Sequence, residues 1–196
     1  MDYFIADLHF GHKSVLSYDN RPFRNIEEHD EALIRNWNSV VKDTDNVYIH
    51  GDVSWHNAEK TAEILKKLKG KKHLIIGNHD HKLLKSKLVR EQFASICPYK
   101  ELYIDKELYV LSHYPIPCFN KHYYGAFHFY GHVHNSFEWN MMEHIRYDME
   151  NLYDKPCNMI NIGCMMSYIN YTPRTAEEIK KGYELFKKEK EPEYER

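Results

Sequence analysis

Two short motifs hold the side chains of this sequence best suited to bind a metal ion. Asp7 and His9 are separated by one residue at the end of an apolar run, and His132 and His134 are separated by one residue after a glycine. Side chains two positions apart on a strand point to the same face, so each motif presents its two polar groups together. Carboxylate oxygens and imidazole nitrogens are common ligands of divalent metals. Each motif therefore predicts part of a metal site.

Three further polar segments follow apolar runs between these two motifs. They are His50-Gly51-Asp52, Gly77-Asn78-His79-Asp80 and Ser112-His113-Tyr114-Pro115. In α/β folds, ligands for metals and phosphates gather outside the ends of strands. One such motif occurs easily by chance, whereas five in order along one chain do not. The sequence therefore predicts one composite site at a set of strand ends.

The elements that must position these residues are strands alternating with helices, as in an α/β domain. The predicted strands are Asp2–Asp7, Asn46–His50, Lys72–Ile76, Glu101–Ile104, Glu107–Ser112, Ala126–Tyr130 and Asn158–Ile162. They are short runs rich in Tyr, Ile and Val. Each of the five polar segments follows one of them.

Three helices are predicted from polar start signals followed by apolar residues at helical spacing. The first opens at Asn25 and the last at Thr175, each with a glutamate three residues on, as in a capping box. The middle helix runs from Asn57 to Gly70, where glycine favours a left-handed stop. The charged segment 187–196 is expected to fray.

Composition favours one globular domain over residues 1–196. The chain is 42% hydrophobic and has no apolar run long enough for a membrane span. Its first ten residues have neither a basic start nor an apolar signal core, so we expect no signal sequence. A net charge of −2 argues against stable binding to nucleic acid. The four cysteines form neither a disulfide framework nor a thiolate metal motif, which fits a reducing compartment. We therefore expect a cytoplasmic protein without a membrane partner.

The five segments together resemble the calcineurin-like metallophosphoesterases, especially their small bacterial and phage-type members. The pattern D-x-H … G-D … G-N-H-[DE] … H … G-H-x-H is present in full from Asp7 to His134, and the runs NVYIHGD, HLIIGNHD and GHVHN extend it. The resemblance implies an α/β fold, namely a four-layer α/β/β/α sandwich of two mixed sheets flanked by helices. It also implies a metal site where the strand ends of the two sheets converge.

The resemblance assigns a full set of metal ligands. One metal takes Asp7, His9, Asp52 and His134, the second takes Asn78, His113 and His132, and Asp52 bridges the two. Since this set holds only oxygen and nitrogen, we expect two divalent transition-metal ions, Mn²⁺ in the first place, with Fe, Zn²⁺ and Ni²⁺ also acceptable. A bridging anion is needed because two cations about 3.5–4 Å apart repel each other.

The resemblance implies hydrolysis of a phosphodiester or phosphomonoester. The implied nucleophile is a hydroxide that bridges the two metals, as Asp52 does. His79 is left without a metal, and the resemblance makes it the general acid or a donor to a phosphoryl oxygen. Asp80 is expected to orient His79 or the adjoining backbone, or else to be a surface or capping carboxylate. Two alternatives are a non-catalytic interaction scaffold with the same fold and a nuclease of the same superfamily.

Three residues are candidate substrate contacts. His12 lies three residues beyond His9 and is either a phosphate contact or a loop histidine. Arg21 is either a bidentate partner of phosphate or a surface arginine. Trp139 is the third, as a flat surface for a nucleotide base. The expected partner is a small phosphorylated substrate of nucleotide type, and the oligomeric state stays open between monomer and homodimer.

The segment Ser136–Pro156 is interpreted as an insertion, because it is longer than the minimum for the resembled family. Its apolar residues at helical spacing are Met142, Ile145, Met149 and Leu152. Such a stripe either packs on the sheet of the protein or forms a pocket wall or subunit interface.

Two further histidines have open interpretations. His50 stands before Gly51 and Asp52, where the resembled family usually has an aliphatic residue, so the packing behind this segment is unsettled. His128 lies an even number of residues before His132, so the two would point to the same face of a strand. It lies either near the site or in ordinary strand packing.

Overall fold

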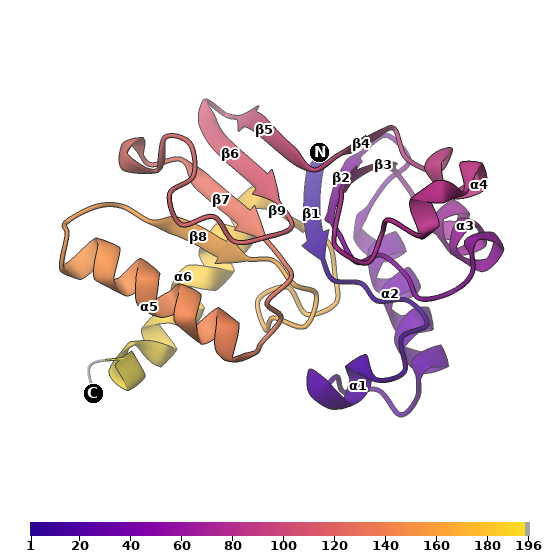
Figure 1. Ribbon diagram of the computed structural model, residues 1–196, viewed down its shortest axis with the longest axis horizontal. Helices are drawn as coiled ribbons and strands as arrows, with labels where there is room; N and C mark the ends of the chain where they lie inside the picture. The colour runs from indigo at the N-terminus through magenta and orange to yellow at the C-terminus, as the bar shows by residue number, and fades with distance from the viewer. Residues whose placement is uncertain (195–196) are drawn as a thin grey trace.

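The computed structural model describes the backbone of residues 1–194 and the side chains of residues 1–189. Two β-sheets face each other at the centre of the molecule, with helices on both outer sides (Figure 1). The five-stranded sheet has the order β4-β3-β2-β1-β9 and the four-stranded sheet the order β5-β6-β7-β8. The strands are β1 Asp2–Ala6, β2 Asn46–His50, β3 Lys71–Ile75, β4 Ser95–Cys97, β5 Tyr99–Ile104, β6 Glu107–Ser112, β7 Phe127–Tyr130, β8 Asn158–Asn161 and β9 Arg174–Thr175.

Both sheets are mixed. Strands β1 to β4 run parallel and β9 pairs antiparallel with β1, while β6 to β8 run parallel and β5 pairs antiparallel with β6. The carboxyl ends of β1, β2 and β3 therefore meet at one edge of the first sheet, and those of β6 and β7 meet at one edge of the second. Backbone bonds join the two sheets there, because Ala6 N donates to Ile162 O and Cys164 N donates to Ala6 O, both at 2.9 Å.

Helices cover the outer faces of the two sheets. In Figure 1, α2 (Ile26–Val40), α3 (Ala58–Lys67) and α4 (Lys87–Arg90) lie beside the first sheet, and α5 (Phe137–Asn151) and α6 (Ala176–Tyr194) beside the second. The short α1 (Val15–Tyr18) and the 3₁₀ turns η1 (Leu83–Lys85) and η2 (His122–Tyr124) lie in connections. The expected mixed α/β sandwich is confirmed. No helix within residues 1–194 is long and apolar enough to cross a membrane.

Aromatic side chains fill the space between the sheets. Phe4 of β1 is fully buried, and its ring centroid lies 5.2 Å from that of Phe129 on β7 and 6.4 Å from that of Tyr109 on β6. Burying such large side chains contributes roughly 1.5–3 kcal/mol each, so this contact holds the two sheets in register. The relative position of the two sets of strand ends follows from this packing.

The predicted helix starts are confirmed. Asn25 Oδ1 accepts a hydrogen bond from Glu28 N at 2.8 Å at the start of α2. Thr175 and Glu178 bond to each other's backbone N–H groups at the start of α6, which is a complete capping box. Helix α6 continues to Tyr194, and residues 195–196 lie outside the described part of the chain, so the expected fraying of 187–196 stays a prediction.

The apolar stripe expected in segment 136–156 is only partly present. Met142 and Met149 of α5 pack against a small core cluster, but Leu152 is 69% exposed. The buried positions of α5 are instead Glu143 and Arg146, which pair at 3.2 Å. A buried ion pair satisfies the polar groups of this face, so sequence hydrophobicity alone misplaces it.

Two buried histidines are satisfied by backbone groups. His128 Nδ1 donates to Val110 O at 2.9 Å and His128 Nε2 accepts from Ile116 N at 3.0 Å, which fixes a neutral ring. Burial lowers the pKa of His128 to about 4. His50 Nδ1 reaches Phe129 O at 3.1 Å across to the second sheet, and burial lowers its pKa to about 3. His128 therefore belongs to strand packing, and His50 links the two sheets.

The lowered pKa of His128 predicts loss of stability in mild acid. Between pH 6.5 and 4 the unfolded chain binds a proton at this histidine that the native state excludes, so the free energy of unfolding falls as pH falls. The contribution of His128 is about 2 kcal/mol between pH 7 and pH 5. Urea unfolding of His128→Gln at both pH values is expected to show a pH dependence smaller by that amount, whereas exposed His81→Gln behaves as wild type. An unchanged dependence in His128→Gln would contradict this account.

Candidate metal centre

The side chains predicted to bind metal converge from five strand ends. Asp7 follows β1, Asp52 follows β2, Asn78 follows β3, and His113 follows β6. His132 and His134 follow β7, and His9 lies two residues beyond Asp7. A pocket of about 320 Å³ lies at this convergence, and its wall includes His9, His12, Tyr18, Asp52, Trp55, Asn78, His79, His132 and His134. The strand-end argument from the sequence thus predicted the right neighbourhood.

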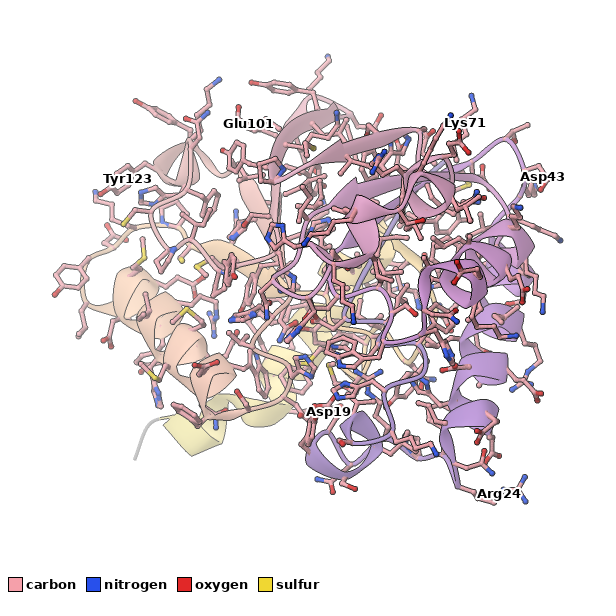
Figure 2. All side chains as sticks on the ribbon, turned by 45° about the vertical axis from the view of Figure 1, so that its right-hand side comes forward. Asp19, Arg24, Asp43, Lys71, Glu101 and Tyr123 are labelled. Atoms are coloured by element: carbon pink, nitrogen blue, oxygen red, sulfur yellow. The ribbon has the colours of Figure 1, made fainter. Side chains whose placement is uncertain are left out.

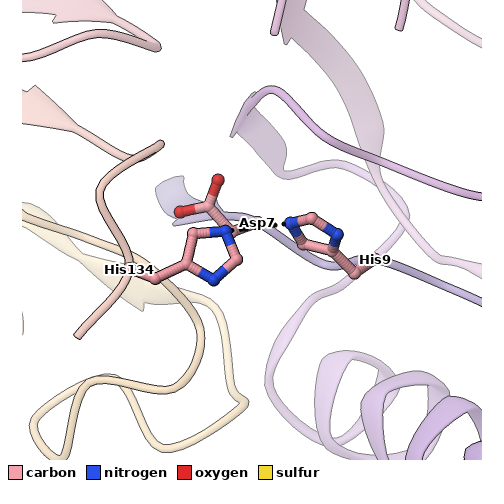
Figure 3. A group of neighbouring side chains, drawn as sticks. All are labelled: Asp7, His9 and His134. Carbon is pink, nitrogen blue, oxygen red and sulfur yellow. Dashed lines mark hydrogen bonds between the residues drawn. The ribbon is translucent and has the colours of Figure 1, made fainter. Parts of the chain in front are cut away.

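One group of potential ligand atoms comes from Asp7, His9 and His134, which lie within 4.8 Å of one another. His9 Nε2 and His134 Nε2 are 3.1 Å apart. Figure 3 shows the two imidazoles approaching from opposite sides, with the Asp7 carboxylate beside them. These atoms could hold one metal ion.

A second group comes from Asp7, Asp52 and His113, again within 4.8 Å. His113 Nε2 lies 3.7 Å from Asp52 Oδ1 and 2.8 Å from Asn78 Oδ1, and His132 Nδ1 lies 3.1 Å from the same Asn78 oxygen. The other oxygen of Asp52, Oδ2, lies 3.7 Å from His9 Nε2 in the first group. Asp52 therefore has one carboxylate oxygen toward each group.

The proton positions in this cluster leave lone pairs facing one another. His113 Nδ1 must donate to the carbonyl oxygen of His50 at 2.8 Å, because a carbonyl only accepts. In the neutral ring, His113 Nε2 then carries a lone pair, yet its neighbours are the oxygens of Asn78 and Asp52. Nitrogen and oxygen lone pairs repel unless a cation lies between them. The donor set therefore fits a divalent metal.

Five of the seven proposed ligands have left-handed backbone conformations. The φ angles are 56° for Asp7, 53° for His9, 54° for Asp52, 70° for His132 and 49° for His134. Such angles are uncommon outside glycine, although Asp and His adopt them more readily than most residues. Strained backbone of this kind concentrates at functional sites.

Two glycines permit the close approach of the carboxylates. A Cβ at Gly77 would lie 2.5 Å from Asp52 Oδ1, and a Cβ at Gly131 would lie 2.8 Å from Asp7 Oδ2. Both distances are far below van der Waals contact. The glycines of the G-N-H and G-H-x-H segments therefore leave the space that Asp52 and Asp7 occupy.

Asp80 is a buried carboxylate that organises backbone. Its oxygens accept hydrogen bonds from the backbone N–H groups of Asp52, Val53 and Gly77 at 3.1, 3.0 and 2.8 Å. Burial raises its pKa to about 6. Of the alternatives predicted for Asp80, orientation of the adjoining backbone agrees with these contacts and the surface carboxylate is wrong.

Arg21 is neither a surface arginine nor exposed to a substrate, so both sequence interpretations are wrong. Its side chain is fully buried, and it donates to Asp7 O at 3.0 Å, to Leu8 O at 3.2 Å and to the Asp19 carboxylate at 2.9 Å. Arg21 therefore fixes the backbone of the first ligand motif from behind. This role follows from the burial of Arg21 among carbonyl and carboxylate groups. Neither its charge nor its position in the sequence reveals that burial.

Asp19 is a functional candidate that sequence reasoning missed. It lies at the end of α1 and is labelled in Figure 2. Its carboxylate accepts from His134 Nδ1 at 2.8 Å. Although burial opposes the charged ring, this bond and the charge of Asp7 raise the pKa of His134. Asp19 thereby directs His134 Nε2 toward the metal cluster, as carboxylates commonly do for metal-bound histidines.

The substrate candidates have different outcomes. His12 lines the pocket, with Nε2 at 3.0 Å from Tyr18 Oη. Trp139 does not line this pocket, since it packs on Phe186 of α6 with ring centroids 5.7 Å apart, so its expected position is wrong. Trp55 is the aromatic residue at the pocket, stacked on His12 with centroids 4.1 Å apart and planes within 2°. Its only sequence signal is a position three residues beyond Asp52.

Comparisons with known sequences find partial relatives. No family model matches the chain. An uncharacterized protein of Methanocaldococcus jannaschii is 49% identical over 80 residues, which are 40% of this chain and 46% of that protein. The Gene 66 protein of Mycobacterium phage L5 is 40% identical over 81 residues, 40% of this chain and 39% of that one. The chain thus matches less than half the length of these curated relatives.

Comparisons with solved structures support the fold. A protein of unknown function from Aquifex aeolicus aligns with a TM-score of 0.61 at 24% identity, covering 92% of this chain and 98% of that one. The nuclease MPE of Pseudomonas putida aligns with a TM-score of 0.42 at 20% identity, covering 68% of this chain and 60% of that one. The first shares the fold, and the second is too distant to support a functional argument.

The contact between Asp19 and His134 predicts that metal affinity depends on Asp19. Asp19→Asn loses the charged acceptor behind His134, and loss of such an outer partner typically weakens metal binding 10- to 100-fold. Calorimetric titration with Mn²⁺ measures the affinity. Asp148→Asn, an exposed position on α5, serves as the charge-matched control and is expected to bind like wild type. Equal affinities for both variants would show that Asp19 does not support the site.

Proposed function

We propose that this protein is a metal-dependent phosphoesterase of the calcineurin-like metallophosphoesterase type, acting on phosphodiesters or phosphomonoesters of nucleotide type. The observation that carries this proposal is that five of the seven candidate ligands, namely His9, Asp52, Asn78, His132 and His134, line one pocket together with His79, with buried Asp7 and His113 grouped behind them. A scaffold without catalysis would not need that set to be complete. Within the described side chains, every position of the ligand motif contributes to the cluster.

In this proposal the two ligand groups hold two divalent ions, with Asp52 between them. Divalent ions held there lower the pKa of coordinated water from about 15.7 toward 7 and neutralise the charge of a phosphate group. The contribution of the chain is to fix the ligands before substrate arrives. Asp19, Asp80 and Arg21 do so from behind, through the bonds described above.

His79 is proposed to supply the proton to the leaving group. Its imidazole is exposed at the pocket wall and makes no hydrogen bond within the described side chains, while its backbone N–H donates to Asp52 Oδ1 at 3.1 Å. The backbone bond holds the residue beside the ligand cluster, and the ring, which contacts Trp55, keeps its nitrogens without a hydrogen bond to the described side chains. A ring nitrogen there can donate to the departing oxygen, which a simple alkoxide requires.

Trp55 supports a nucleotide-type substrate. Its indole is 37% exposed and its ring centroid lies 4.5 Å from that of His79. Bases stack on such aromatic faces with a gain of about 1–3 kcal/mol. Trp55 therefore takes the role that the sequence suggested for Trp139.

The proposed activity is tested by a substrate panel with metal-reconstituted protein. Phosphomonoesters, phosphodiesters and cyclic nucleotides are supplied to protein loaded with Mn²⁺ and to protein treated with chelator. We expect metal-dependent hydrolysis that Asp52→Asn abolishes together with metal binding. Full metal loading with no turnover of any ester would favour the scaffold alternative and reject the enzyme.

The role of His79 predicts a dependence on the leaving group. His79→Ala is expected to keep metal content unchanged and to lower kcat about 10²- to 10⁴-fold for an alkyl ester, because general acid catalysis is lost. For a nitrophenyl ester the loss is expected to be smaller, since nitrophenolate departs without a proton. Steady-state kinetics with both esters measure this difference. Equal losses would remove His79 from the acid role.

The position of Trp55 predicts selectivity for substrates with a base. Trp55→Ala is expected to raise KM for nucleotide diesters roughly 5- to 100-fold, in line with the loss of one stacking contact, and to leave KM for a dialkyl phosphate nearly unchanged. Trp55→Phe keeps an aromatic face and is expected to recover part of the loss. If Trp55→Ala shifts both KM values alike, the indole shapes the pocket without contacting a base.

A further inference from the structure

A second, larger groove adjoins the metal pocket. It has a volume of about 860 Å³ and shares Trp55, Asn78 and His79 with the metal pocket as a common wall. The rest of its lining comes from Ser54, His56, Asn57, Ala58, His81, Lys82, Leu83 and Lys85. The two hollows are therefore adjacent and meet at Trp55, Asn78 and His79.

The charged side chains that line this groove are all basic. Its lining contains two lysines and three histidines and no carboxylate residue. Lys82 and Lys85 are exposed and form no ion pair with the described side chains. The whole chain has a net charge of −2, so this unpaired positive charge is local. A concave surface with unpaired cations attracts anionic ligands.

The backbone that carries these lysines is anchored to the site. Asp80 is buried and bonds to the loop that holds Asp52, and Leu84 N donates to Asp80 O at 3.0 Å. Leu83, between the two lysines, is also buried. Lys82 and Lys85 thus extend from a turn whose position is fixed relative to the ligand cluster, unlike lysines on a free loop.

The position of His79 indicates which part of a substrate the groove would bind. If His79 donates its proton to the departing oxygen, the leaving group must lie on the side of His79, and the groove is the space available there. We infer that this groove binds the leaving group, and that the leaving group carries at least one further phosphate held by Lys82 and Lys85. This inference rests on the proposed function. A leaving group with a further phosphate occurs both in a nucleotide chain and in a dinucleoside polyphosphate.

Binding without hydrolysis provides the first test. Chelator-treated protein is titrated with fluorescein-labelled dTpdTpdT between 50 and 200 mM KCl, and anisotropy gives the affinity. Neutralising one phosphate of a single strand adds about 0.7 to the slope of log affinity against log salt. Because dTpdTpdT has one phosphate beyond the scissile one, Lys82→Gln/Lys85→Gln is expected to lower that slope by about 0.7. Lys66→Gln/Lys67→Gln removes the same charge from exposed positions outside the groove and is expected to keep the wild-type slope.

Kinetics with matched substrates provide the second test. In dTpdT the leaving group has no phosphate, whereas cleavage of dTpdTpdT can release one that does. The groove variant Lys82→Gln/Lys85→Gln is expected to raise KM roughly ten-fold for dTpdTpdT and to leave KM for dTpdT within two-fold, as expected for two exposed charge contacts. A dinucleoside tetraphosphate forms a third arm. If the groove variant has a raised KM for the dinucleoside tetraphosphate alone, the leaving group is linked through a polyphosphate. If its KM is raised for the trinucleotide, the leaving group is a nucleotide chain.

The outcomes separate this inference from the proposed function. If wild type hydrolyses these substrates and the groove variant matches it in slope and in every KM, the groove does not bind the leaving group. If wild type hydrolyses no ester at all, the proposed function fails. In that case the salt slopes measured with chelator still decide whether Lys82 and Lys85 contact phosphate, and an unchanged slope overturns the inference.

Discussion

The constraint on which this structure depends is the repulsion among buried acceptor atoms at one point. Asp7 and Asp52 are almost completely buried, and His113 directs a lone pair at the oxygens of Asp52 and Asn78. Asp52 Oδ1 accepts from His79 N and the Asp7 carboxylate accepts from His132 N, but no donor separates His113 Nε2 from the oxygens of Asp52 and Asn78, so this arrangement is costly without a cation. With divalent cations the same atoms become ligands. The fold thus holds buried acceptor groups close together in an arrangement that fits a bound cation.

The fold meets this constraint by fixing the ligands from outside. Arg21 donates to the carbonyls of Asp7 and Leu8 and to Asp19, and Asp19 in turn accepts from His134. Behind Arg21, its Nη1 lies 2.9 Å from His29 Nε2, and His29 Nδ1 lies 2.9 Å from Asp30. These outer contacts stabilise a backbone whose φ angles are unfavourable. The candidate metal centre is thus held in place by Arg21, Asp19 and Asp30, none of which lines the pocket.

The parts of the molecule that are predictable from sequence are those governed by local patterns. Strand ends after apolar runs located Asp7, Asp52, Asn78 and His113, since parallel strands bring their carboxyl ends to one edge. The structure differs where long-range burial decides the outcome. Arg21 could not be distinguished from a surface residue by its charge, because its burial depends on contacts with Asp7 O, Leu8 O, Asp19 and His29 that only the folded chain brings together.

The tryptophans near the pocket show the same limit of prediction from local sequence. Trp139 lies five residues beyond His134, but α5 turns its indole toward α6, whereas Trp55 reaches the pocket from the loop after β2. In α5 the apolar residues suggested one buried face, yet Glu143 and Arg146 are buried because they pair with each other. Periodicity identifies a helix correctly and misjudges its buried face when charged side chains satisfy each other.

The central claim is that two cations reconcile this cluster, and metal stoichiometry tests it most directly. Protein stripped with chelator, reloaded with excess Mn²⁺ and freed of unbound ion is measured by elemental analysis alongside Asp52→Asn. The account predicts two ions per chain in wild type and a loss of metal in Asp52→Asn. A folded wild-type protein that holds one ion or none under these conditions would contradict it.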